Sequence, residues 1–116
     1  AVAEIPQLRV TYDNGNVTTG GESPYDGFRN SAAHIVHAHF KDFRIVPEGM
    51  EGLDGKRRTG ALVGDGDVDQ RGGLRAMKEC GYAGHINFEY EGNEMTPRAA
   101  TVEGVRRLRE WIASVQ

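Results

Sequence analysis

The stretch HIVHAHFKD, residues 34–42, decides the fold, because it combines the pattern of a β-strand with a row of ionisable side chains. Apolar and polar residues alternate along it with period two, which is typical of a strand that buries only one face. The apolar set is Val36, Ala38 and Phe40, and the polar set is His37, His39 and Lys41. The pattern leaves three roles open for these histidines: buried structural residues, ligands of a metal ion, or one wall of an active site.

Two other segments share this alternation. They are LRVTYD, residues 8–13, and HINFEYE, residues 85–91. Each predicts a strand with one apolar and one polar face, and each carries a carboxylate toward its C-terminal end, Asp13 in the first and Glu89 in the second. The sequence therefore predicts three strands, each with one apolar and one polar face.

Helical patterns lie between and after these strands. The predicted helix starts are Ser23-Pro24, Asp67 or Asp69, and Thr96-Pro97. Gly81 is a C-terminal stop for the second helix. Residues 43–66 have no periodic pattern and predict a long loop. Strands that alternate with helices indicate an α/β fold with parallel strands and right-handed crossovers.

The polar strand faces favour a barrel over an open sheet. In an open parallel sheet, helices cover both faces and the strands are apolar throughout, whereas the open end of a (β/α)8 barrel presents polar side chains inward, at the C-terminal ends of its strands. A complete barrel needs about 250 residues. We therefore expect residues 1–116 to form one domain that is an incomplete TIM barrel.

Composition limits the possible partners. The chain has 116 residues, of which 38% are hydrophobic and 27% charged, with a formal net charge of −3. This charge gives no reason to expect nucleic acid as a partner, and no apolar run is long enough to span a membrane. Cys80 is the only cysteine, which fits a reducing, cytoplasmic location.

Asp13, His39 and Glu89 are expected on inward faces, near the C-terminal ends of their strands. Two carboxylates and an imidazole form an N/O donor set that suits Mn²⁺, Mg²⁺, Co²⁺ or Zn²⁺. From spacing alone, a metal site and a buried network of hydrogen-bonded polar residues remain equally open.

Four segments together resemble the closing portion of the xylose isomerase-like TIM barrels. They are YDNGN (residues 12–16), HIVHAHFKD (34–42), LVGDGDVD (62–69) and KECGYAGHINFEYEG (78–92). This superfamily contains sugar and sugar-phosphate isomerases and epimerases, dehydratases and the apurinic endonuclease IV type. The resemblance implies that the chain holds the last three βα units of the barrel.

The resemblance also implies residue roles. Asp13 and His39 match the family's metal ligands, and Glu89 matches the glutamate that both binds metal and transfers protons. A further family glutamate on an earlier strand, a ligand and second proton-transfer group, has no counterpart here. Lys41, Asp42 and Asn16 match positions that contact substrate. His37, which shares a face with His39 one layer deeper, is a further candidate for the substrate site.

The implied function is a metal-dependent isomerase or epimerase that transfers a proton next to the carbonyl of a sugar or related keto-polyol. The implied small-molecule partner is a sugar or a keto-acid. The rest of the barrel would come from another polypeptide or segment, or from a homo-oligomer. Two alternatives remain: a lyase or dehydratase of the same superfamily, and a non-catalytic barrel-completing subunit or inactive fragment. Endonuclease activity is not expected, since Asn16 stands where that enzyme type needs a histidine and residues 43–84 lack an Asp-x-His pair.

Overall fold

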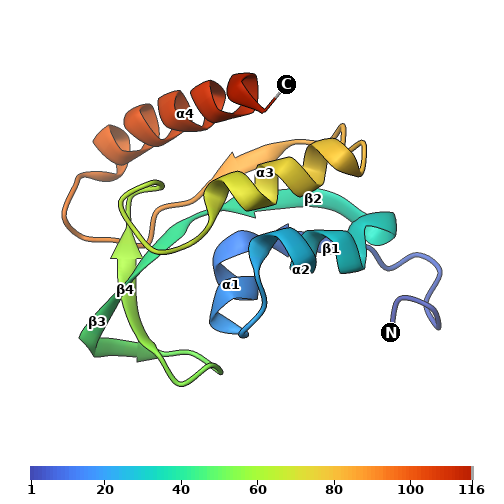
Figure 1. Cartoon of the computed structure of the whole chain (residues 1–116), viewed down its shortest axis with the longest axis horizontal. Helices are drawn as coiled ribbons and strands as arrows, with labels where there is room; N and C mark the ends of the chain where they lie inside the picture. Colours follow the sequence, from blue (N-terminus) through green and yellow to red (C-terminus); the bar gives the residue numbers. More distant parts are fainter. Residues whose placement is uncertain (116) are drawn as a thin grey trace.

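The structure is a computed structural model that describes residues 1–115. Its elements follow the alternating order of an α/β protein (Figure 1). They are β1 (Val10–Asp13), α1 (Asn14–Thr19), α2 (Pro24–Ser31), the 3-10 turn η1 (Ala32–His34), β2 (Ile35–Phe40), β3 (Asp42–Glu51), β4 (Arg57–Ala61), α3 (Gln70–Glu79), β5 (Ile86–Phe88) and α4 (Pro97–Ser114).

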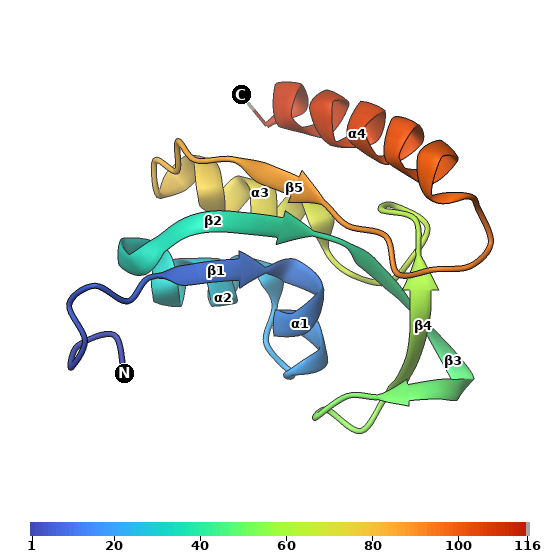
Figure 2. The same ribbon diagram turned by 180° about the vertical axis from the view of Figure 1, so that it is seen from behind.

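Strands β1, β2 and β5 form a parallel sheet with β2 in the centre. Helices α2 and α3 cover one face of this sheet, and α4 runs beside β5 (Figures 1 and 2). The opposite face of the sheet points toward the viewer in Figure 2. None of the helices in residues 1–115 covers it. A parallel sheet with helices on one face only is a segment of a barrel wall, as the sequence predicts.

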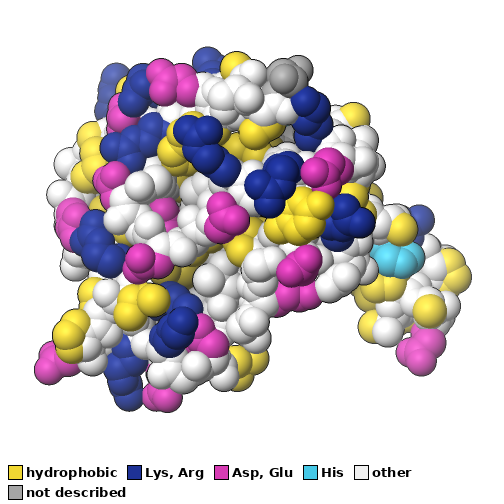
Figure 3. Space-filling view, viewed as in Figure 1, with side chains coloured by type: hydrophobic (Ala, Val, Ile, Leu, Met, Phe, Trp, Pro, Cys, Tyr) yellow, Lys and Arg dark blue, Asp and Glu magenta, His cyan; other side chains and the backbone are white. Residues whose placement is uncertain are grey.

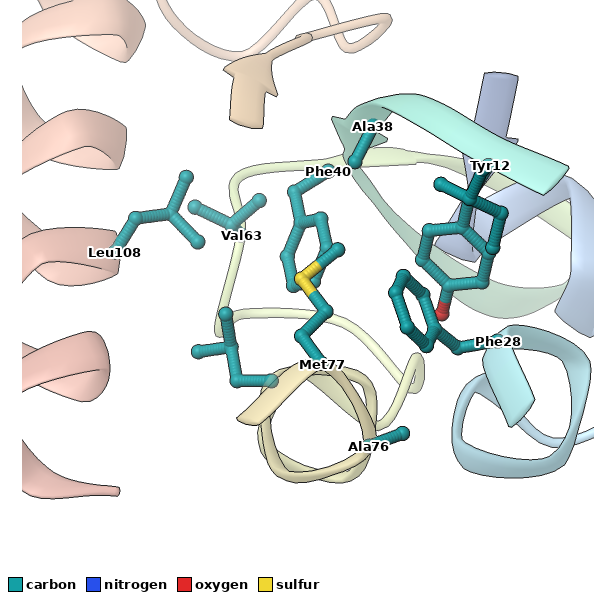
Figure 4. Packing of buried hydrophobic residues seen from close by; sticks show 10 residues of the cluster. Tyr12, Phe28, Ala38, Phe40, Val63, Ala76, Met77 and Leu108 are labelled. Atoms are coloured by element: carbon teal, nitrogen blue, oxygen red, sulfur yellow. The ribbon is translucent and has the colours of Figure 1, made fainter. Parts of the chain in front are cut away.

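The apolar face of the sheet packs on the helices. Figure 4 shows Tyr12 and Phe40 of the strands against Phe28 of α2 and Met77 of α3. The rings of Tyr12 and Phe28 meet edge to face, with centroids 5.1 Å apart. The Tyr12 hydroxyl donates to the Pro24 carbonyl at 2.9 Å, so the one polar atom of this side chain is satisfied inside the core.

A β-bulge interrupts the alternation predicted for β2. Val10 pairs with Ile35, whereas Thr11 pairs with His37, so Val36 has no partner in β1. The bulge turns Ile35 into the core and leaves Val36 56% exposed, which corrects the prediction that Val36 belongs to the apolar face. Beyond it the alternation is regular, with Ala38 and Phe40 buried.

Residues 43–66 were expected to be a loop without secondary structure, and this expectation was wrong. β3 and β4 pair as an antiparallel hairpin that projects from the sheet (Figure 1). Its pairing is interrupted between Ile45 and Met50, so the segment has no continuous period of two for sequence reasoning to detect. Inside the hairpin, Arg58 makes a two-pronged hydrogen bond to Asp54 at 2.9 and 2.6 Å.

The helix boundaries follow the predicted caps. Asp69 and Thr96 accept hydrogen bonds from the backbone N–H groups of Gly72 and Ala99, respectively. Gly81, with φ of +71°, follows the C-cap of α3, a backbone conformation that favours glycine. The short helix α1, which follows β1 without a break, was not predicted.

The surface carries both signs of charge. Lys and Arg side chains intermix with Asp and Glu over the face seen in Figure 3. Within residues 1–115, none of the helices combines the length and apolar character needed to cross a bilayer.

Candidate metal centre

The parallel register brings Asp13, His39 and Glu89 together. Asp13 is the last residue of β1 and lies opposite His39 of β2, and His39 lies opposite Asn87 of β5. Glu89 directly follows β5, and its backbone N–H donates to the Phe40 carbonyl at 2.9 Å. All three side chains therefore lie at the C-terminal ends of adjacent strands, on the face that the helices leave uncovered.

The ligand atoms of these three residues converge. One atom from each lies within 4.8 Å of the others. His39 Nδ1 is 3.9 Å from Asp13 Oδ2 and 3.6 Å from Glu89 Oε2. Both distances are too long for hydrogen bonds, so the three atoms face a common point without bonding to one another.

Asp13 uses its two oxygens differently. Oδ1 accepts the backbone N–H of Asn16 at 2.9 Å and caps helix α1. Oδ2 faces His39 Nδ1 and Lys41 Nζ. The cap thereby fixes the carboxylate in the orientation that points its second oxygen at the cluster.

Lys41 contributes a buried cation to the same place. Its Nζ lies 3.2 Å from Asp13 Oδ2, 3.2 Å from Glu89 Oε2 and 3.0 Å from Glu91 Oε1, and its side chain is only 5% exposed. Burial by itself lowers the pKa of Lys41, but the hydrogen bond to Glu91, the charge of Asp13 and the contacts to both ligands outweigh burial and raise that pKa above its ordinary value.

Two buried amides hold the backbone of Lys41. Asn14 Oδ1 accepts the Lys41 N–H at 2.9 Å, and Gln70 Nε2 donates to the Lys41 carbonyl at 2.8 Å. The amides are joined by a hydrogen bond from Asn14 Nδ2 to Gln70 Oε1 at 2.7 Å. We call these two residues the amide clamp; sequence reasoning missed both.

The aliphatic part of Lys41 passes close to Gly15. A Cβ at position 15 would lie 2.7 Å from Lys41 Cγ and 2.9 Å from the Phe43 ring, so a larger residue would displace the lysine. The clamp and this close approach together restrict the backbone and the aliphatic stem of Lys41.

The structure places the predicted substrate residues in different settings. The His37 ring lies edge to face with that of His39, with centroids 5.1 Å apart. Asn16 is exposed at the third position of α1, and its backbone N–H donates to Oδ1 of the capping Asp13. Lys41 is in direct contact with two of the three ligand residues. These three remain candidates by position.

Asp42 lies outside the cluster, which departs from its predicted role as a substrate contact. It is 1% exposed, and its two oxygens accept the N–H groups of residues 43, 64, 66 and 68 at 2.8–3.0 Å. Burial raises the pKa of this carboxyl, opposed by those hydrogen bonds. The geometry gives Asp42 the role of organising the turn between β4 and α3.

The donor set fits a divalent ion. Asp13, Glu89 and Glu91 bring three carboxylates to one ammonium group, which leaves two negative charges for a further cation to balance. Two carboxylate oxygens and one imidazole nitrogen are ligands used for Zn²⁺, Mn²⁺ and Co²⁺. Asp13, His39 and Glu89 are thus able to supply three ligands to such an ion.

Comparison with known proteins identifies the family. The family described as xylose isomerase-like TIM barrel matches residues 1–111. The chain belongs to this family. The resemblance expected from the sequence is thereby confirmed, and the fold is that of a partial TIM barrel.

The chain is similar to curated enzymes and to proteins of solved structure. An inosose dehydratase of Clostridium tetani is 30% identical over 108 residues, which are 87% of this chain. A xylose isomerase domain protein from Alicyclobacillus acidocaldarius matches 95% of this chain and 39% of its own, with 25% identity and a TM-score of 0.72. The IOLI protein, solved with a bound zinc atom, matches 99% of this chain and 42% of its own, with 16% identity and a TM-score of 0.72.

The match covers only part of these proteins. The chain spans 31% and 36% of the length of curated relatives that it matches. The cluster therefore corresponds to a portion of the wall of a full barrel.

Proposed function

We propose that the chain provides the metal-binding wall of an isomerase or epimerase that transfers a proton next to the carbonyl of a sugar, a related keto-polyol or a keto-acid. The observation that carries this proposal is the convergence of Asp13, His39 and Glu89 within 4.8 Å at the C-terminal strand ends. In TIM barrels this end of the strands is where catalysis takes place.

Asp13, His39 and Glu89 would hold the divalent ion, with Mn²⁺, Mg²⁺, Co²⁺ and Zn²⁺ as candidates. Bound there, the ion would supply Lewis acidity that makes a C–H next to a coordinated carbonyl easier to deprotonate. The zinc atom in the IOLI structure supports a metal in this fold.

Glu89 is the proposed proton carrier. Its side chain is 37% exposed on the open face, so a substrate could reach it, unlike the 12% exposed Asp13. Its Oε2 lies 3.2 Å from Lys41 Nζ, and a carboxylate in this position can accept a proton from a substrate carbon.

Lys41, His37 and Asn16 are the proposed substrate contacts. An ammonium group and an imidazole can bind the oxygens of a polyol, and the exposed Asn16 amide lies near the carboxyl end of β1. We do not carry Asp42 forward in this role, because its oxygens are enclosed by backbone N–H groups.

The proposed reaction needs groups from outside this chain. A fourth ligand and a second proton-transfer group would come from the remaining βα units of the barrel, in another polypeptide or segment or in a second copy. The outer edges of β1 and β5 support this, since the described residues provide neither strand with a partner there. A non-catalytic subunit that completes a barrel is the alternative if no metal binds.

Dehydration is the second candidate reaction, favoured by the curated inosose dehydratases among the relatives. Both reactions begin with loss of the same kind of proton. They differ in whether the proton returns to carbon or a neighbouring hydroxyl leaves.

Proton exchange tests the shared step. Purified protein, with any chain that co-purifies, is incubated in D₂O with Mn²⁺ and either a ketohexose or an inosose, and the C–H signal next to the carbonyl is followed by NMR. We expect metal-dependent loss of that signal, abolished by Glu89→Gln and retained by Glu48→Gln, an exposed glutamate of the hairpin. Loss of water identifies the dehydratase; no exchange with any substrate contradicts the proposal.

A further inference from the structure

The position of Lys41 has a consequence for the metal itself. Lys41 Nζ contacts Asp13 Oδ2 and Glu89 Oε2, the same two oxygens that face His39 Nδ1. An ammonium group and a divalent ion would therefore bind the same two carboxylate oxygens. Two cations that share anionic ligands repel each other, and the repulsion is strong where water is excluded.

The backbone and the aliphatic stem of Lys41 are held in place. The amide clamp fixes both polar groups of its backbone, and its Cγ packs closely against Gly15, beside the Phe43 ring. Only 5% of the Lys41 side chain is exposed, so its charge lies inside the protein, next to the ligand carboxylates.

Glu91 gives the ammonium group a carboxylate partner outside the ligand set. Its Oε1 is 3.0 Å from Lys41 Nζ, and its side chain is 42% exposed. Glu91 thus offers Lys41 a negative charge apart from Asp13 and Glu89. An ammonium group shifted toward Glu91 would leave the two ligand carboxylates freer to bind an ion.

We propose that Lys41 is a buried internal cation that weakens divalent-metal binding by sharing Asp13 and Glu89 with the ion, and that Glu91 relieves this competition by drawing the ammonium group toward itself. The proposal rests on the proposed function, because it requires a metal at Asp13, His39 and Glu89. It makes Lys41 and Glu91 a pair that sets metal affinity, a role separate from contact with substrate. When the ion is absent, the charge of Lys41 offsets part of the negative charge of the ligand carboxylates.

Titration of Mn²⁺ into the purified protein, followed by calorimetry, tests this without any assay of activity. Lys41→Met keeps an unbranched side chain, one atom shorter than lysine, and removes its charge; we expect it to bind Mn²⁺ about tenfold more tightly, as removal of one nearby positive charge predicts. Glu91→Gln should bind Mn²⁺ several-fold more weakly. In a Lys41→Met background the Glu91→Gln effect should shrink, because no ammonium group is left to be drawn away.

Two control variants separate the effect of Lys41 and Glu91 on Mn²⁺ affinity from the general effect of removing a charge. Glu94→Gln makes the same chemical change three residues from Glu91, at a carboxylate that pairs with Arg44. Lys56→Met removes an exposed lysine in the turn of the hairpin. Both controls should leave Mn²⁺ affinity within about twofold of wild type, since exposed charges are screened by solvent.

Three results would overturn the inference. One is a folded Lys41→Met variant that binds Mn²⁺ no more tightly than wild type; another is an equal effect of Glu91→Gln in both backgrounds. If Lys41→Met does not fold, the Glu91→Gln variant alone tests the inference. The third contradicting result is then a Glu91→Gln variant that binds Mn²⁺ as tightly as Glu94→Gln.

Loss of Mn²⁺ binding in Asp13→Asn shows that the ion occupies the proposed site. If neither wild type nor Lys41→Met binds Mn²⁺, the proposed function fails as well, whereas binding that is insensitive to Lys41 removes only this inference.

Discussion

The Asn14 side chain donates to the side chain of Gln70 at 2.7 Å, although 56 residues separate the two. The pair encloses the backbone of Lys41, which lies between the end of β2 and the start of β3. At this point the parallel sheet ends and the hairpin begins, so the strand ladder no longer satisfies the Lys41 peptide groups. Two buried amides replace the ladder there.

Removal of either amide should destabilise the fold. Asn14→Ala leaves the Lys41 N–H without its partner, and Gln70→Ala leaves the Lys41 carbonyl without its own. We expect each to lower the free energy of unfolding by about 1–3 kcal/mol. The double variant should cost less than the sum, because each single change also breaks the bond between the two amides.

Urea denaturation of the four members of this cycle gives the coupling directly. Asn93→Ala, at an exposed position, is the control and should change the free energy of unfolding by less than about 0.5 kcal/mol. Strict additivity of the two single variants would show that the amides do not act as a unit.

At Gly15, helix propensity and packing predict opposite effects of an alanine substitution on stability. Alanine in place of glycine inside a helix ordinarily stabilises it by about 1 kcal/mol. At Gly15 the new Cβ would lie 2.7 Å from Lys41 Cγ, so we expect Gly15→Ala to destabilise the protein by about 1–3 kcal/mol. Thermal unfolding measures this, with Gly20→Ala as the control, where the nearest atom would be 3.3 Å away. A gain in stability for Gly15→Ala would contradict the close approach.

The buried carboxylate of Asp42 should matter for stability. It accepts N–H groups from Phe43, Gly64, Gly66 and Val68. Asp42→Asn turns one acceptor oxygen into a donor that faces those N–H groups, and we expect a loss of about 2–4 kcal/mol in the free energy of unfolding. Chemical denaturation provides the value, and a change below about 0.5 kcal/mol would show that the turn does not depend on this carboxylate.

Stability at alkaline pH should depend on Tyr12. Burial, and then the charges of Asp13 and Asp69, raise the pKa of Tyr12 above the ordinary value of 10.0. The unfolded chain ionises this tyrosine near pH 10 while the folded chain keeps it neutral, so its contribution to stability is fully present below that pH and is lost as pH rises toward the folded pKa. Unfolding free energies measured from pH 8 to pH 11 should fall more steeply in wild type than in Tyr12→Phe. Equal slopes would rule out this contribution.

Much of the fold could be predicted because apolar and polar residues alternate in three short segments, which identifies the buried and exposed faces of three strands. The alternation around Ala38 and Phe40 located β2, and the Thr96-Pro97 pair located the start of α4. The bulge at Val36 was not predictable, since it depends on the register with β1. The hairpin was missed because its pairing is irregular and its residues are mostly exposed.

The candidate site was predictable to the same extent. Asp13, His39 and Glu89 stand near strand ends, where topology alone brings them together. Gln70 and Asn14 carry no such signal: each is one polar residue in a polar stretch, and only the tertiary structure makes them neighbours. In the sequence YDNGN, Asn14 directly follows Asp13, and this neighbourhood is the one indication in the sequence that Asn14 lies near the site.

The most direct measurement is the metal content of the protein after equilibrium dialysis against Zn²⁺ or Mn²⁺, determined by elemental analysis. Wild type and Glu48→Gln should retain a chelator-removable divalent ion, and Asp13→Asn, His39→Ala and Glu89→Gln should each lose it while remaining folded by circular dichroism. An ion that is absent from wild type, or retained equally by all three ligand variants, would contradict the assignment of this cluster as a metal centre.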